Sequence, residues 1–163
     1  MNLLLKQQLL LTVRALYFCM DNQWSEIGKE YDISPAQQHI LFLLSTNRNE
    51  LTPSKIGELG CWHASTVTRL LKRLENNGYI DVRAKENQAR YKLVSMTDKG
   101  KCVLKNIFET VKSMEQFPFD LRQLSEDEVV HFINYGKKIL DVHKGESFMR
   151  DVISKPMKDL DYA

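Results

Sequence analysis

Apolar residues recur along most of this chain at steps of three and four, the spacing that one face of an α-helix requires. Ala64, Val67, Leu71 and Leu74 form the sharpest stripe, which predicts a helix from Ala64 to Asn77 with one side against a core. The outer face is polar and basic: Ser65, Thr66, Arg69, Lys72, Arg73 and Asn76. Hydroxyls at a helix start suit contact with phosphate, and an arginine can fork onto guanine or phosphate.

The segments on both sides of this helix define its context. Thr52-Pro53 predicts the capped start of a short helix that ends near Leu59, and Gly60 is expected to supply the turn that follows. After the Asn77-Gly78 stop signal come two strand-like runs, residues 79–83 and 90–94, joined by the polar segment 84–89. Two helices, a short turn and a hairpin in this order predict a winged helix-turn-helix.

Charge supports this interpretation. Eight Lys and Arg but four Asp and Glu lie between Thr52 and Lys92, a net charge of +4, whereas the whole chain carries +2. A charged face on one helix is typical of any solvated surface, so it does not by itself indicate nucleic-acid binding. The ordered set of capped helix, turn, basic helix and basic hairpin is far more specific, and it places positive charge where DNA would lie.

The run STVTRLLKRLENNGYI from Ser65 to Ile80, followed by Arg90 and by LVSMTDKG from Leu93 to Gly100, resembles the MarR family of winged-helix transcriptional regulators. The resemblance extends from about Leu9 to Val142. It implies a dimer joined through both chain ends, and it implies that Arg90 on the wing reaches the minor groove. One departure is Gln88, which stands where the family usually has an Asp that pairs with the wing arginine.

The pattern and the resemblance together nominate a set of DNA contacts. These are Thr52, Ser54, Lys55, His63, Ser65, Thr66, Thr68, Arg69, Lys72, Arg73, Arg83, Lys85 and Arg90.

The rest of the chain extends this core with further helices. A first helix from about Leu4 to Tyr31 is apolar over more than one stripe. A second helix from Pro35 to about Thr46 precedes a polar loop at 47–50. Two more helices are expected after the hairpin, from Thr97 to about Glu115 and from Ser125 to about His143. We therefore expect a mainly α fold with a small β-hairpin wing. Residues 1–31 and 97–143 are assigned to dimerisation, 32–96 to the winged helix-turn-helix, and 144–163 to a loose tail or short docked helix.

Composition excludes several classes of protein. Charged residues interrupt every apolar run of the first twenty residues, so neither a signal peptide nor a membrane span is expected, and the protein should be cytoplasmic. Its four histidines are scattered, and the three cysteines at 19, 61 and 102 make no metal-type pair, so we expect no catalytic site, metal or cofactor. Cys19 is expected in the core, whereas Cys61 at the helix start keeps redox control open as an alternative.

These observations favour a sequence-specific DNA-binding regulator, most simply a homodimeric repressor on a pseudo-palindromic operator. A small-molecule effector would act between the dimerisation region and the winged domain, where Tyr17, Trp24 and His39 are candidates to line its pocket. The alternative is a winged-helix module for protein–protein assembly whose basic face is incidental.

Overall fold

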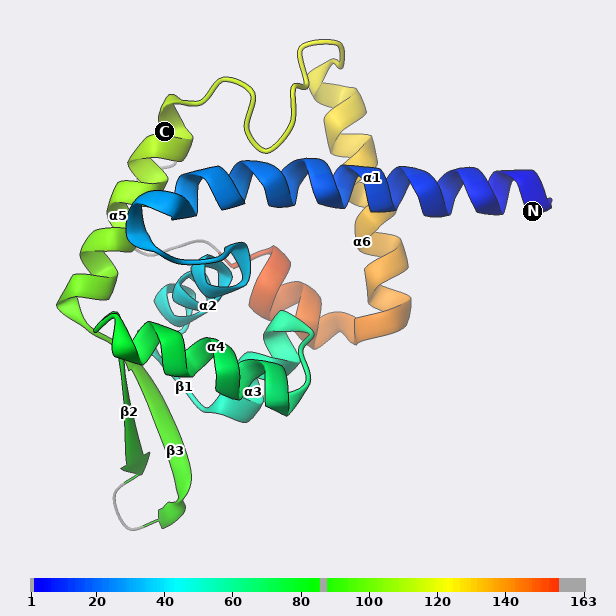
Figure 1. Ribbon diagram of the computed structural model, residues 1–163. Helices are drawn as coiled ribbons and strands as arrows, with labels where there is room; N and C mark the ends of the chain where they lie inside the picture. Colours follow the sequence, from blue (N-terminus) through cyan, green and yellow to red (C-terminus); the bar gives the residue numbers. More distant parts are fainter. Residues whose placement is uncertain (1, 86–87, 156–163) are drawn as a thin grey trace.

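The computed structural model describes residues 2–85 and 88–155, without the side chains of residues 85 and 88–91. It is mainly helical with one small sheet, as predicted (Figure 1). In chain order the elements are α1 (Leu3–Gly28), a 3-10 turn (Lys29–Tyr31), α2 (Pro35–Thr46), β1 (Glu50–Leu51), α3 (Pro53–Gly60), α4 (Ala64–Asn76), β2 (Ile80–Lys85), β3 (Gln88–Met96), α5 (Asp98–Ser113), α6 (Glu126–Phe148) and a π-helical turn (Met149–Ile153).

Except for α4, the α-helices begin where a local side chain accepts a hydrogen bond from one of their first backbone N–H groups. Ser34 and Ser125 each form a complete capping box, with Gln37 and Glu128 reaching back to the cap. Thr52 caps α3 by accepting a bond from the Lys55 backbone N–H. Thr97 caps α5 in the same way. These starts lie where the sequence predicted them, because a cap depends only on residues within one turn.

The core is organised around α2. This helix is buried on more than one side, because its fully buried side chains are Ile40, Leu41, Leu43 and Leu44. Helices α1, α3, α4 and α5 and strand β3 all pack against α2. The apolar stripe of α4 joins the same core through Val67, Leu71 and Leu74, whereas Ala64 at its start is exposed rather than buried as the stripe suggested. The recognition-type helix is thus held on a rigid base.

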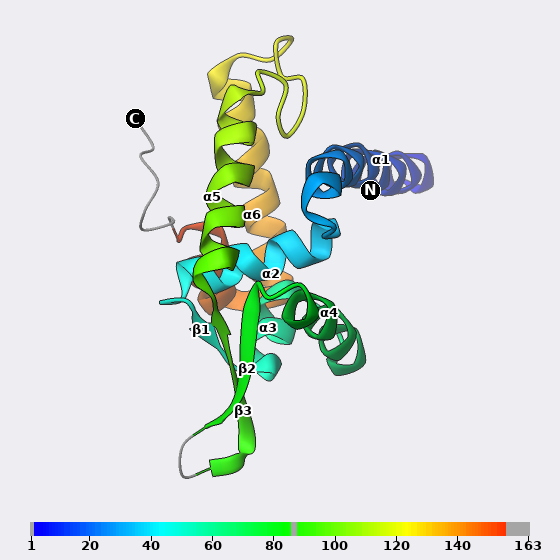
Figure 2. The ribbon, with the colours of Figure 1, turned by 60° about the vertical axis from the view of Figure 1, so that its left-hand side comes forward.

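The sheet is antiparallel with the strand order β1-β3-β2. Val94 of β3 pairs with Leu51 on one side and Val82 on the other. Figures 1 and 2 show the hairpin of β2 and β3 projecting beyond the helices, beside α4. The expectation of a plain loop at residues 47–50 was wrong at Glu50, because β1 exists only through its pairing with β3 and carries no periodic pattern of its own.

The turn between α3 and α4 also differs from the prediction. Gly60 remains in the helix, and Cys61 takes the left-handed conformation with φ 59°. Gly60 is required for packing instead: a Cβ there would lie 2.3 Å from the Trp62 ring. Gly60 therefore leaves room for the Trp62 ring, and Cys61 makes the turn.

Helix α6 runs past its predicted end at His143 and changes direction at Gly145, where φ is 77° and ψ is 169°. The chain then folds back onto the winged domain. Val152 packs against the core, and Lys155 Nζ donates to Asn47 Oδ1 at 2.7 Å. Of the two predicted alternatives for residues 144–163, the described part to residue 155 is a docked segment; residues 156–163 lie outside the described part.

Two long helices leave apolar side chains uncovered. On α1, Leu10 is 66% exposed; on α6, Phe132 is 60% and Val142 82% exposed. The N-terminal half of α1 extends beyond the winged core (Figure 1). By length and composition alone, Leu3–Tyr31 could cross a membrane. Cys19 on α1 is exposed, so its expected place in the core was wrong: only the C-terminal end of α1, through Trp24 and Ile27, packs on the core.

Candidate nucleic-acid interface

Helix α4 presents a polar face on the side opposite its buried stripe. Ser65, Thr68, Arg69, Lys72 and Arg73 are all exposed there, and Thr66 is half-buried. His63 is the residue before the first turn, and its side chain makes no capping bond. The first backbone N–H groups of α4 are thus left without a side-chain cap, the condition in which a helix N-terminus accepts an anion.

The cations of this surface differ in how they are paired. Lys55 makes an ion pair with Glu58 at 2.7 Å, Arg83 with Asp81 at 2.9 Å, and Arg73 with Asp32. Among the residues that the structure describes, Arg69 and Lys72 make no ion pair. Exposed pairs are worth about 0–1 kcal/mol, so phosphate can compete for the paired cations. Arg69 and Lys72 can bind phosphate without first breaking an ion pair with a described residue.

The hydroxyl groups among the nominated DNA contacts also fall into two sets: some bond within their own helix, and others are exposed at a helix start. Thr52 caps α3, and Thr68 Oγ1 donates to the Ala64 carbonyl at 3.0 Å, so both serve their own helix. Ser54 and Ser65 are exposed at the starts of α3 and α4. On the wing, the side chains of Lys85 and Arg90 lie outside the described part, as does that of Gln88.

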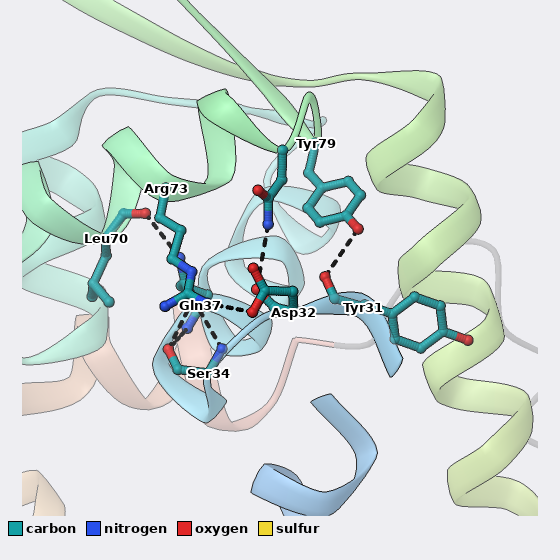
Figure 3. Close-up of polar contacts among 8 residues, drawn as sticks. Tyr31, Asp32, Ser34, Gln37, Leu70, Arg73 and Tyr79 are labelled. Atoms are coloured by element: carbon teal, nitrogen blue, oxygen red, sulfur yellow. Dashed lines mark hydrogen bonds and ion pairs between the residues drawn. The ribbon is translucent and has the colours of Figure 1, made fainter. Parts of the chain in front are cut away.

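The loop between α1 and α2, together with the first turn of α2, anchors α4, which the sequence analysis did not predict (Figure 3). Gln37 Nε2 donates to the Leu70 carbonyl at 3.3 Å, and Asp32 pairs with Arg73. Tyr79 OH, at the start of the wing, donates to the Tyr31 carbonyl at 3.0 Å. These contacts tie α4 and the base of the wing to the end of the α1–α2 loop and to the start of α2.

A cavity of about 500 Å³ lies between α1, α2, α5 and the turn before α4. Tyr17, Trp24 and His39, the three nominated effector contacts, all line it. Burial lowers the pKa of the His39 imidazole below its usual 6.5, so this side chain is neutral at pH 7. The structure brings these residues together; their role in ligand binding stays a prediction.

The described residues contain no group of three His, Cys, Asp or Glu side chains placed to hold a metal ion. Cys19, Cys61 and Cys102 are free thiols, all exposed.

Comparison with known proteins agrees with this geometry. Residues 33–92 match the MarR family. The HTH-type transcriptional regulator Hpr of Bacillus cereus is 31% identical over 96 residues, covering 59% of this chain and 51% of that protein. Its counterpart in Bacillus licheniformis is 31% identical over 108 residues, covering 66% and 52%. The chain spans about half the length of the curated relatives that it matches.

Solved structures share the fold at lower identity. The MarR family transcriptional regulator Sco5413 of Streptomyces coelicolor has a TM-score of 0.73 at 22% identity, covering 87% of this chain and 96% of that one. A mutant MarR from E. coli, complexed with operator DNA, has a TM-score of 0.74 at 22% identity, covering 86% and 99%. The organohalide-sensing regulator RdhR with bound 2,4-dichlorophenol has a TM-score of 0.76 at 15% identity, covering 98% and 91%. The core of the chain, residues 33–92, thus matches the MarR family, and the winged-helix fold around it is shared with solved structures of such regulators.

Proposed function

We propose that this protein is a sequence-specific DNA-binding transcriptional regulator that acts as a homodimeric repressor in the cytoplasm. The observation that carries the proposal is the exposed face of α4, where Arg69 and Lys72 are free of ion pairs with the described residues. The relatives support it: Hpr is named a transcriptional regulator, and the E. coli MarR mutant was solved with operator DNA. Such a regulator needs no catalytic group, in line with the prediction that the protein is not an enzyme.

In this proposal residues 32–96 bind DNA and α4 enters the major groove. Arg69, nearer the helix start, contacts base edges, whereas Lys72 contacts phosphate. Binding of the uncapped start of α4 to the backbone would set the register. Arg83, Lys85 and Arg90 would follow the adjacent groove from the wing.

The exposed apolar faces of α1 and α6 support dimerisation through residues 1–31 and 97–143. Apolar surface of this extent is an association site on a soluble protein, and pairing two chains about a two-fold axis covers it. Two α4 helices would then meet half-sites about 10 base pairs apart. An effector in the 500 Å³ cavity would act on this arrangement, because the cavity lies between α1 and the winged domain.

Selection of bound duplexes from a random pool, followed by fluorescence anisotropy, tests DNA recognition. Arg69→Ala is expected to cost about 1–3 kcal/mol on the selected site and to relax one base position. Lys72→Ala should weaken binding to all duplexes and reduce the salt slope by about one unit. Lys105→Ala removes a charge from the exposed side of α5 and is the matched control. No enrichment from the pool, or equal losses in all three variants, would contradict the proposal.

Sedimentation tests the dimer. The 19.0 kDa chain should sediment as a species of twice that mass at micromolar concentration. Phe132→Glu on α6 should shift it towards monomer, whereas the neighbouring His131→Glu, also exposed, should not. Retention of the protein in the membrane fraction of a cell lysate would instead show that α1 inserts into lipid.

A further inference from the structure

The cavity between α1 and the winged domain has an unusual proportion of aromatic walls. Its aromatic lining residues are Tyr17, Trp24, His39, Phe42, Trp62, Phe108 and Phe117. Several pack edge-on: the ring centroids of Trp24 and Phe117 lie 4.8 Å apart, and those of His39 and Trp62 lie 5.6 Å apart. Both tryptophans of the chain lie here. The face of an aromatic ring carries partial negative charge, so rings in a cavity wall favour a positive group on a ligand.

The polar residues of the wall include one side chain that is charged at pH 7, and that charge is negative. Among the residues that the structure describes, no lysine or arginine lines the cavity, and Asp21 on α1 is the single acidic residue there. Asp21 makes no ion pair with any residue that the structure describes. Gln38, only 3% exposed, also belongs to the wall: its Nε2 donates to the Trp24 carbonyl at 2.8 Å, and its Oε1 is buried without a partner. Because that oxygen has almost no accessible surface, what the described wall offers a ligand is the Asp21 carboxylate, without a cation.

We infer that this cavity binds an aromatic organic cation, such as a protonated amine on an apolar body. An effect of this ligand on DNA binding rests on the proposed function, but the binding of the ligand itself needs no DNA. The positive group would lie beside Asp21 and over the aromatic faces, an arrangement worth about 0.5–2 kcal/mol from the cation–π contacts alone. The apolar body would fill the space between Trp24, Phe42 and Phe108.

An anionic ligand of the same shape meets the opposite conditions. Its carboxylate would lose water without gaining a cation, and it would lie near the Asp21 carboxylate and the electron-rich ring faces. His39 does not compensate, because burial disfavours its protonated form. The cavity thus selects ligands by charge as well as by shape.

Occupation of the cavity reaches the DNA-binding face through Trp62. This residue follows Cys61 in the turn before α4, and its backbone N–H donates to the Gly57 carbonyl at 2.9 Å. Its ring packs so closely on Gly60 that no Cβ fits between them. A ligand that contacts this ring therefore lies directly against the turn that leads into α4.

Binding is tested with two probes of equal length and opposite charge, phenylbutylammonium and phenylbutyrate, titrated into the full-length protein without DNA. Since both tryptophans line the cavity, intrinsic tryptophan fluorescence reports occupation directly, and calorimetry supplies the affinity. We expect phenylbutylammonium to bind about tenfold or more tightly than phenylbutyrate. Equal affinities, tighter binding of phenylbutyrate, or binding of neither probe would overturn the inference.

A matched pair of variants locates the selectivity. Asp21→Asn and Glu26→Gln each remove one negative charge from α1, but Glu26 lies outside the cavity, paired with Lys29 at 2.6 Å. Asp21→Asn should abolish most of the tenfold preference, and Glu26→Gln should retain it. The same loss in both variants, or in neither, would show that Asp21 does not set the selectivity.

Failure of this inference is separable from failure of the proposed function. Binding of selected DNA without any preference for the ammonium probe overturns the ligand class and leaves the regulator intact. A clear preference for the ammonium probe in a protein that enriches no DNA sequence supports the ligand class and overturns the regulator.

Discussion

Replacing Gly145 with alanine is expected to release the segment Met149–Lys155 from the winged domain. Gly145 has φ 77° and ψ 169°, a backbone region that glycine alone occupies readily, and other residues there pay about 1–3 kcal/mol. A Cβ at this position would meet no atom within 4 Å, so backbone strain is the whole effect. The same substitution at Gly136, in the helical part of α6 and equally open, should stabilise the helix by about 0.5–1 kcal/mol.

The docked segment has little free energy to resist this strain. Val152 is half-buried against the core, which contributes about 1 kcal/mol, and the bond from Lys155 to Asn47 adds a similar amount. Since the strain of about 1–3 kcal/mol is of the same size as this total of about 2 kcal/mol, the chain should relax by undocking rather than by unfolding.

Amide hydrogen exchange measures both effects. In Gly145→Ala the Ser154 N–H, bonded to the Met149 carbonyl at 3.0 Å, should lose about tenfold or more of its protection. In Gly136→Ala the amides of α6 should gain up to about fivefold, because 1.4 kcal/mol corresponds to a factor of ten. Changes of the same sign in both variants, or full protection of Ser154 in Gly145→Ala, would refute the assignment of Gly145 as the residue that directs the docking.

Three further outcomes are expected. Cys61→Gly should stabilise the fold by about 0.5–1 kcal/mol in urea denaturation, because glycine adopts a φ of 59° without strain, whereas Cys61→Ala should not stabilise it. Gln37→Ala should cost about 1–3 kcal/mol by leaving the Leu70 carbonyl and the Ser34 N–H unpaired, and Gln37→Glu, which keeps the cap but buries a carboxylate oxygen against the Leu70 carbonyl, should cost at least as much. Folding lowers the pKa of His39, so the unfolded chain binds its proton at higher pH, and stability should fall as pH drops through about 6.5; His39→Gln should flatten that slope in denaturation curves between about pH 7 and about pH 5.

Much of the winged core was predictable from local pattern. The two unlike faces of α4 and the caps at Ser34, Thr52, Thr97 and Ser125 depend on residues within a few positions of one another. Such features are encoded by spacing alone, because a helix repeats every 3.6 residues and a cap reaches only one turn. The mainly α fold with a hairpin wing followed from them.

Where the local rules misled, the packing of the folded chain had decided the outcome. Gly60 was expected to make the turn before α4, but close packing against Trp62 keeps it in α3 and leaves the left-handed position to Cys61. Glu50 forms a strand only because Ser95 lies opposite. Cys19 was expected in the core, yet α1 packs on α2 only near its C-terminal end.

The amino-acid sequence by itself determined the elements, their starts and the basic face of α4. The tertiary structure alone decided how that face is held and what surrounds it. Asp32 meets Arg73 across 41 residues, and Lys155 meets Asn47 across 108. No periodicity encodes such pairs, since they form only when the shared core brings separate helices together. The aromatic cavity arises in the same way, because its walls come from helices that each bury a different stripe.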